Sequence, residues 1–116
     1  MSTHVSIVIP VFNSELLIKR CLNSVVNQNG NFNLEIICIN DGSSDNSLKV
    51  LKEYNYNLHI INQKNKGQAA ARNVGINLSK GKYIAFLDAD DYWRPGFLQK
   101  TVSFLEKNSQ AVAVST

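Results

Sequence analysis

Three carboxylates stand within four residues at the end of an apolar run. Asp88, Asp90 and Asp91 directly follow residues 82–87, which are typical of a buried strand. Two like charges 4 Å apart repel by about 1 kcal/mol in water and about 4 kcal/mol at an effective dielectric of 20. Mg²⁺ and Mn²⁺ relieve such repulsion, because they take oxygen ligands and share them with substrate phosphates. The pattern indicates a site for a cation that carries phosphates; a polar turn capping the next helix is the alternative.

Two further aspartates stand where a second apolar run ends. Asp41 follows this run and precedes Gly42, so its carboxylate is expected at the edge of a sheet, where it can accept hydrogen bonds from a base or ribose. A plain Asx turn is the alternative, since Asp-Gly-Ser is a common turn composition. Asp45 stands just ahead of a predicted helix, and we expect it to cap that helix.

Residues 66–75 combine a loop glycine, a helix start and an arginine one turn in. A helix N-terminus favours negative charge and Arg72 can fork onto a phosphate, so this segment suits a pyrophosphate neighbour. A solvated surface charge is the alternative for Arg72. Gly75 costs about 1 kcal/mol relative to Ala inside a helix, which indicates close packing there.

The elements that must position these residues alternate along the chain. We predict strands at 5–10, 34–40, 58–61, 82–87 and 111–114. Helices are expected from a cap at Asn13 or Ser14, through Leu16 and Leu17, to Val26; then at 47–54, at 68–78, and from Arg94 or Pro95 to Lys107. This order predicts an α/β fold with a mainly parallel sheet between two helical layers. The carboxyl ends of the strands then gather residues 10–13, 40–43 and 88–91 into one crevice.

Composition limits the remaining choices. The 116 residues are expected to form a single domain spanning 1–116, and 44% hydrophobic with 18% charged content excludes a disordered chain. No apolar run approaches the roughly 18 residues of a membrane span, and nothing resembles a signal peptide, so we expect a cytoplasmic location. The net charge of +3 is scattered, which argues against nucleic acid as a partner. Cys21 and Cys38 are expected to be small core residues.

Four segments in this order, residues 6–13, 35–47, 65–75 and 81–91, resemble the nucleotide-sugar-binding part of the family 2 glycosyltransferases. The resemblance covers nearly the whole chain. It implies a Rossmann-like GT-A fold that binds a nucleoside-diphosphate sugar, with UDP as the expected nucleotide and Mn²⁺ or Mg²⁺ as the metal.

The resemblance also implies roles for single residues. Asp88-Ala89-Asp90 would be the aspartate motif of the family, in which Asp90 holds the metal and Asp88 contacts the ribose or a metal-bound water. Asp91 would be left over, as a helix cap. The nucleotide would be bound by Asp41 on the base, Pro10 and Phe12 framing it, Glu15 on the ribose side, and Arg72 near the base or the phosphates. Phe12 departs from the tyrosine often found at its position, which keeps stacking but loses a hydroxyl contact.

Members of this kind transfer the sugar with inversion to an acceptor hydroxyl, and the acceptor expected here is a saccharide or a lipid-linked polymer of a bacterial envelope. Inversion needs a carboxylate general base. Glu106 is the single acid after Asp91, so we expect the base and the acceptor site to lie beyond this chain, as the C-terminal part of a larger domain.

Two other functions are weighed against this one. The first is a non-catalytic nucleotide-binding or assembly module of the same fold. The second, a nucleotidyltransferase, is disfavoured because residues 11–15 lack the glycines and lysine of its usual basic loop. A homo-oligomer, and peripheral association of the full-length protein with a membrane, stay open.

Overall fold

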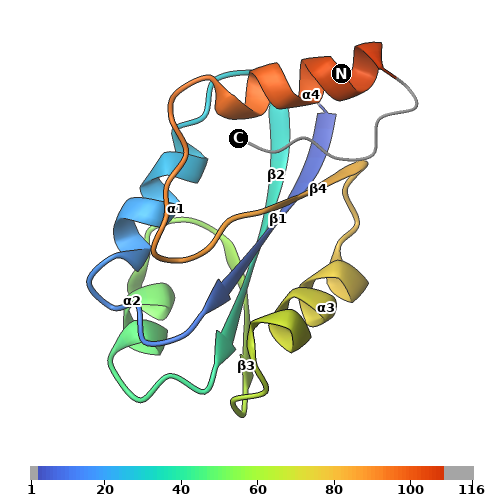
Figure 1. The fold of residues 1–116 in the computed structure, drawn as a ribbon. Coiled ribbons are helices and arrows are strands. Elements are labelled where there is room, and N and C mark those ends of the chain that lie inside the picture. Colours follow the sequence, from blue (N-terminus) through green and yellow to red (C-terminus); the bar gives the residue numbers. More distant parts are fainter. Residues whose placement is uncertain (1–2, 109–116) are drawn as a thin grey trace.

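The computed structural model describes residues 3–108, which form a sheet with helices on both faces (Figure 1). Strands and helices alternate without exception along this part of the chain. Their order is β1 (Thr3–Val11), α1 (Ile18–Val26), β2 (Phe32–Asp41), α2 (Ser47–Glu53), β3 (Leu58–Gln63), α3 (Gln68–Leu78), β4 (Tyr83–Phe86) and α4 (Phe97–Lys107). The strand predicted at 111–114 lies outside the described residues.

All strand pairs in the sheet are parallel, and the strand order is β3-β2-β1-β4. From β1 to β3 the chain moves steadily to one side, and α3 then carries it back to the other side of β1. The strand order therefore reverses beside β1. In open α/β sheets, ligands bind outside the carboxyl ends of the strands at such a reversal. The predicted α/β fold with a parallel sheet is confirmed.

Alternation of side chains along the strands builds one core on each face of the sheet. On one face, Ile7 and Ile9 of β1 pack with residues of α1, α2 and α4, such as Leu22, Leu51 and Leu98. On the other face, Val8, Ile37 and Ile39 pack against Ala71 of α3. This arrangement confirms the predicted three layers, and Cys21 and Cys38 are buried as expected.

Gly75 lets α3 approach the central strand. A Cβ at this position would stand 2.3 Å from Cγ1 of Val8, which is closer than real side chains come. The predicted close packing at Gly75 is therefore confirmed. It keeps α3, and with it Gln68 and Arg72, against the sheet.

The prediction for the start of α1 was wrong. The helix begins at Ile18, whereas Leu16 is 90% exposed and Leu17 is also exposed. The carbonyl oxygen of Ser14 accepts hydrogen bonds from the amides of Leu17 and Ile18, so a tight turn precedes the helix. Neither Asn13 nor Ser14 caps the helix with its side chain.

Two further predictions need correction. β4 is not a buried strand, since Ile84 is 40% and Phe86 is 45% exposed. It pairs with β1 alone among the described strands, and α3 packs on β1 and β2 instead. The last helix begins at Phe97, after Pro95, because Gly96 adopts a left-handed φ of 83° that a helix cannot contain. Within residues 3–108, no helix is long and apolar enough to cross a membrane.

Candidate functional site

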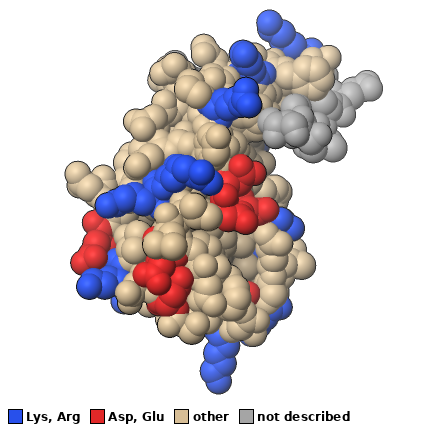
Figure 2. Space-filling view, turned by 60° about the vertical axis from the view of Figure 1, so that its left-hand side comes forward, with Lys and Arg blue, Asp and Glu red and all other residues tan. Residues whose placement is uncertain are grey.

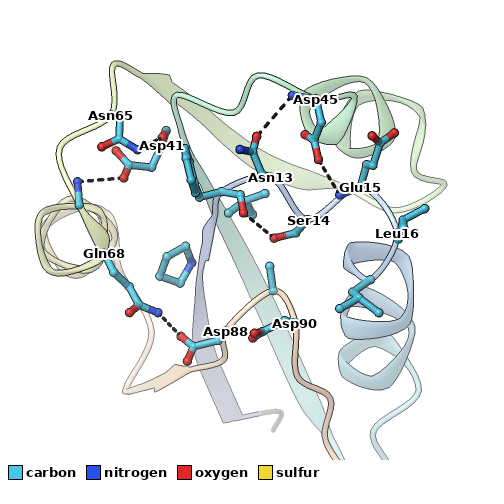
Figure 3. A pocket seen from close by; sticks show the side chains of 16 residues that line it. Asn13, Ser14, Glu15, Leu16, Asp41, Asp45, Asn65, Gln68, Asp88 and Asp90 are labelled. Carbon is cyan, nitrogen blue, oxygen red and sulfur yellow. Dashed lines mark hydrogen bonds between the residues drawn. The ribbon is translucent and has the colours of Figure 1, made fainter.

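A pocket of about 750 Å³ opens at the carboxyl ends of the strands, where the strand order reverses (Figure 3). This volume falls within the range of about 300–1,000 Å³ that is typical of small-molecule sites. Loops that follow all four strands contribute to its lining: residues 10–17, Asp41, Asp45, Asn65, Gly67, Gln68 and 88–90. Of the residues predicted for the site, only Arg72 is not part of this lining.

Asp41 is held by the loop that leads into α3. It is 3% exposed, and its Oδ1 accepts hydrogen bonds from the Lys66 amide at 2.7 Å and from Nε2 of Gln63 at 3.0 Å. Its Oδ2 accepts one from the Gly67 amide at 2.9 Å. Burial alone would raise the pKa of Asp41, but these hydrogen bonds outweigh burial and lower it. A carboxylate offers about four acceptor sites, so about one remains for a ligand.

Asn13 ties the loop after β1 to the loop after β2, a role that the sequence prediction missed. Its Oδ1 accepts hydrogen bonds from the amides of Ser44, at 2.8 Å, and Asp45, at 3.3 Å. The backbone amide of Asn13 donates a hydrogen bond to Oγ of Ser43 at 3.0 Å. Asn13 has a φ of 46°, and asparagine is one of the few residues that tolerate this left-handed region. That tolerance was the available sequence signal.

Asp45 extends this connection between the two loops. Its Oδ1 accepts the amide of Ser47, the first residue of α2, but Asp45 stands one residue before the N-cap, which is Asn46, so the predicted cap is displaced by one position. Its Oδ2 accepts the Glu15 amide at 3.2 Å, which the sequence did not suggest. Burial would raise the pKa of Asp45, but its hydrogen bonds to Ser47 and Glu15 lower it. The Ser14 amide donates to Oγ of Ser47 and adds a further link.

The remaining residues predicted for the nucleotide differ in exposure. Pro10 is buried at the end of β1, whereas about half of Phe12 is exposed, so its ring is available to a flat ligand. Glu15 is half-buried, and Figure 3 shows its carboxylate near Asp45, on the far side of the pocket from Asp88 and Asp90. Glu15 therefore lies beside Asp45 and apart from Asp88 and Asp90.

Asp88 is held by two side chains of α3. Its Oδ1 accepts a hydrogen bond from Nε2 of Gln68 at 2.8 Å (Figure 3) and another from Nη2 of Arg72 at 3.1 Å. The ion pair with Arg72 is 39% and 43% exposed on its two side chains, so water screens it. Gln68 was not predicted as a site residue. Arg72 lies beside the acidic loop rather than in the pocket wall.

Asp90 is exposed, and its carboxylate accepts no hydrogen bond from a residue in the described part of the chain. No group of three or more His, Cys, Asp or Glu within residues 3–108 is arranged to hold a metal by itself. Mg²⁺ and Mn²⁺ commonly take only one or two carboxylates and complete their shell with phosphates and water. Asp90, together with the second oxygen of Asp88, fits such an ion when a diphosphate is present.

Asp91 does not cap a helix, which corrects the prediction made for it. Its Oδ1 accepts the amide of its neighbour Tyr92, and α4 begins six positions later at Phe97. Burial, together with the negative charges of Asp91, Asp88 and Asp90, raises the pKa of the Cys21 thiol to about 12. The protonated thiol donates a weak hydrogen bond to the Asp88 carbonyl oxygen at 3.6 Å.

Charged side chains of both signs are interspersed on the α1 side of the molecule (Figure 2). On the face shown, the lysines and arginines of the described residues alternate with acids instead of forming a continuous basic stripe. A nucleic-acid-binding surface usually presents such a stripe. This face therefore carries no basic stripe of that kind.

Comparisons with known proteins agree with the fold. The family model for glycosyl transferase family 2 matches residues 6–116. The poly(ribitol-phosphate) beta-glucosyltransferase of Bacillus spizizenii is 40% identical over 116 residues, which covers 95% of this chain and 18% of that protein. The chain spans between 16% and 36% of the length of five curated relatives.

Solved structures extend this likeness to three dimensions. TarS 1–349 of S. aureus, solved in complex with UDP-GlcNAc, is 27% identical with a TM-score of 0.77, over 94% of this chain and 32% of that one. The mannosyltransferase PcManGT of Pyrobaculum calidifontis, in complex with GDP-Man and Mn²⁺, has a TM-score of 0.80 at 21% identity, over 90% of this chain and 33% of that one. The second likeness shows the fold alone.

Proposed function

The chain belongs to glycosyl transferase family 2, and from this premise we propose that it is the donor-binding part of a glycosyltransferase. In this proposal it binds a nucleoside-diphosphate sugar, with UDP as the nucleotide, through Mn²⁺ or Mg²⁺. The sugar is transferred with inversion to an acceptor hydroxyl. One observation carries the proposal: at one end of the pocket at the strand reversal, carboxylates accept several hydrogen bonds, and at the other end the Asp90 carboxylate has no hydrogen-bond partner among the described residues.

The nucleoside occupies the bonded end. Asp41 keeps about one acceptor site, which suits an N–H donor of a base. The exposed ring of Phe12 offers an apolar surface on which a base can stack, Pro10 lines the pocket wall, and Glu15 is assigned to the ribose side. Support also comes from TarS, which shares the fold at 26% identity and was solved in complex with UDP.

The diphosphate occupies the end with Asp88 and Asp90. Asp90 would hold the divalent ion directly, and Asp88 would contact it through its free oxygen or through water. When bound, the ion neutralises the negative charge that develops on the leaving diphosphate. The side chains of Arg72 and Gln68 already donate hydrogen bonds to Asp88, so both are close enough to contact a phosphate bound next to Asp88. PcManGT, which shares this fold, was solved with Mn²⁺.

The general base is proposed to lie beyond this chain. Glu106 is the one acid after Asp91, and its Oε2 lies 3.9 Å from Nζ of Lys82, beside the start of β4 and away from the pocket residues. We therefore propose donor binding with little or no transfer by residues 1–116 alone. The same observation keeps the non-catalytic module as the second candidate. Turnover with any sugar acceptor at a rate normal for a transferase would contradict both.

The acceptor is proposed to be a saccharide or a lipid-linked polymer, as the poly(ribitol-phosphate) in one relative's name suggests. With a lipid-linked acceptor, the full-length protein would work in the cytoplasm at the inner face of the membrane.

Calorimetric titration of UDP into the chain, with Mn²⁺ and with chelator, tests the proposed donor site. We expect Mn²⁺ to tighten UDP binding in the wild type. Asp90→Asn should remove this gain. Outer-shell partners of metal ligands contribute roughly 10- to 100-fold to metal affinity, so the loss of a direct ligand should weaken UDP binding with Mn²⁺ by at least that factor. Asp91→Asn is the matched control, because it removes the same charge one residue away and keeps an oxygen for the Tyr92 amide. It should change the affinity by less than about fivefold.

Metal-independent binding of UDP by the wild type would contradict the metal assignment. Equal losses in Asp90→Asn and Asp91→Asn would show that only the net charge of the loop matters.

A further inference from the structure

The acidic residues of the pocket lie on a segment without regular secondary structure. Residues 87–96 connect β4 to α4, and Figure 1 shows this segment, in orange, passing alongside α1. Before it, β4 is an edge strand of the described sheet. At its two ends, the Leu87 amide donates to the Val8 carbonyl oxygen of β1 and the Gly96 carbonyl oxygen accepts the Lys100 amide of α4. The backbone groups between these ends have no helix or sheet partners, so they need other hydrogen bonds wherever they are buried. The side chains that form those hydrogen bonds therefore determine the positions of Asp88 and Asp90.

Three side chains on one side of α1 supply them. Arg20, Ser24 and Gln28 are spaced four residues apart, which places them in a row along the helix and its C-terminal extension; we call them the α1 row. Nη2 of Arg20 donates to the Asp90 carbonyl oxygen at 3.1 Å, and Oγ of Ser24 accepts the Trp93 amide at 3.0 Å. Gln28 donates to the Arg94 carbonyl oxygen at 2.9 Å and accepts the Leu98 amide at 2.8 Å.

Additional contacts fix the direction of these bonds. The Arg20 guanidinium lies 4.5 Å from the centre of the Tyr92 ring, so it is stacked as well as hydrogen-bonded. Ser24 donates its own hydroxyl hydrogen to the Cys21 carbonyl oxygen at 2.7 Å, which leaves a lone pair for the Trp93 amide. Trp93 is 8% exposed and its ring packs against Phe97 at 4.8 Å. The segment is thus fastened at successive points from Asp90 to Leu98.

Asp90 depends on this support more than Asp88 does. The Asp88 carboxylate is held by Gln68 and Arg72 of α3, whereas the Asp90 carboxylate has no hydrogen-bond partner within residues 3–108. Its direction is therefore set by its backbone, and Arg20 is the side chain bonded to that backbone.

We propose that the α1 row consists of positioning residues that hold the peptide of Asp90 so that its carboxylate points at the diphosphate of the donor. This inference rests on the proposed function of the site. The row touches neither nucleotide nor sugar; it acts through the carboxylate, as outer-shell partners of metal ligands do. Such partners contribute about 10- to 100-fold to metal affinity. The row should therefore affect binding that uses the ion and not binding of the base.

Arg20→Ala tests the row most directly, because Arg20 is exposed and its loss should not unfold the chain. We expect this variant to bind UDP with Mn²⁺ about tenfold more weakly than the wild type, at the lower limit for an outer-shell partner. Its affinity for uridine should stay unchanged. Lys19→Ala is the matched control, since it removes the same charge one residue earlier from an exposed position. Arg20→Lys keeps the charge but loses the planar fork, and should recover only part of the affinity.

Ser24→Ala gives a second readout that needs no ligand. Trp93 is the single tryptophan of the sequence, and its amide is the group that Ser24 holds. In metal-free protein we expect the Trp93 emission of this variant to shift to longer wavelength, because a loosened segment exposes the ring. The emission of Lys19→Ala should match the wild type. An unchanged emission in Ser24→Ala would count against the row.

The outcomes separate the inference from the proposed function. If Mn²⁺ does not tighten UDP binding even in the wild type, the metal proposal is overturned, and the positioning role with it. If the wild type gains from Mn²⁺ and Arg20→Ala keeps that gain, only the positioning role is overturned. Equal weakening of uridine and UDP in Arg20→Ala would also overturn it, by showing a general structural role.

Discussion

At one end of the pocket, Asp41 and Asp45 accept hydrogen bonds at both of their carboxylate oxygens, whereas at the other end Asp90 accepts none from residues 3–108. The bonded pair joins the loops after β1, β2 and β3 into a fixed wall. Asp90 instead protrudes from the segment between β4 and α4, where Arg20 bonds its backbone carbonyl oxygen. These aspartates thus have different roles. Asp41 and Asp45 maintain the shape of the pocket, whereas the Asp90 carboxylate is left available for a ligand.

Asp41→Ala should give the largest effect on stability. It leaves the amides of Lys66 and Gly67 and the side chain of Gln63 without their acceptor, and hydrogen bonds to a charged group contribute about 1.5–3 kcal/mol each. We expect the free energy of unfolding to fall by about 3 kcal/mol or more. Uridine and UDP should both bind more weakly, and by similar factors. Urea denaturation followed by Trp93 fluorescence measures the first effect, and calorimetry the second.

Asp90→Asn is the control for that experiment, because its carboxylate has no bonds to lose within the described chain, and its stability should match the wild type. Comparable destabilisation by the two substitutions would contradict the difference between the two ends. A loss of affinity for diphosphates alone in Asp41→Ala would move Asp41 to the phosphate end.

The second-largest expected effect is a loss of stability at low pH, caused by protonation of Asp41 and Asp45. Hydrogen bonds lower the pKa values of Asp41 and Asp45 below their ordinary value of 3.8. A carboxylate with a lowered folded pKa stabilises the fold above its unfolded pKa, and this contribution is lost as the pH falls through the folded pKa. We expect the free energy of unfolding to decline below about pH 4, by at most about 1.4 kcal/mol per pH unit for each proton taken up.

The double variant Asp41→Asn, Asp45→Asn should show a smaller decline when urea denaturation is repeated at a series of pH values. Some decline will remain, because hydrogen bonds from Ser6 and the Lys80 amide also lower the pKa of Glu35, which lies away from the pocket. An unaltered pH dependence in the double variant would show that these two aspartates do not stabilise the fold by their charge.

Arg72→Gln should have the smallest effect on the fold. The two side chains of its ion pair with Asp88 are 39% and 43% exposed, and solvent-screened pairs contribute about 0.2–1 kcal/mol to stability. We expect the affinity for UDP to fall more than the affinity for uridine, because Arg72 stands at the phosphate end. Lys64→Gln, which removes a charge from the exposed loop before α3, is the control in the same titrations. A larger loss for uridine would place Arg72 at the base.

Local sequence patterns were sufficient for the order of strands and helices. The β-branched run of β2 is buried on both faces as its composition predicts, and the glycine of α3 marks its closest approach to the sheet. The same logic failed for β4, because burial of Ile84 and Phe86 depends on which strand and helix lie beside them. It also failed at Leu16 and Leu17, where apolar spacing continued into a turn set by the Ser14 carbonyl.

The composition of the site was predictable, but not its connections. Residues at strand ends meet at one edge in any parallel sheet, so Asp41, Asp88 and Asp90 could be grouped from the sequence. The bonds of Asn13 to Ser44 and Asp45 join residues about 30 positions apart, and no local pattern specifies them. The same holds for the row on α1, whose partners lie some 70 positions later.

The most direct test of the difference between the two ends is one set of four calorimetric titrations of the wild-type chain: uridine and UDP, each with Mn²⁺ and with chelator. The nucleoside end needs no metal, so uridine should bind equally well in both conditions. UDP should bind more tightly with Mn²⁺, because only its diphosphate reaches Asp88 and Asp90. If UDP binds equally well in chelator, or if Mn²⁺ tightens uridine by the same factor, the account of two distinct ends is wrong.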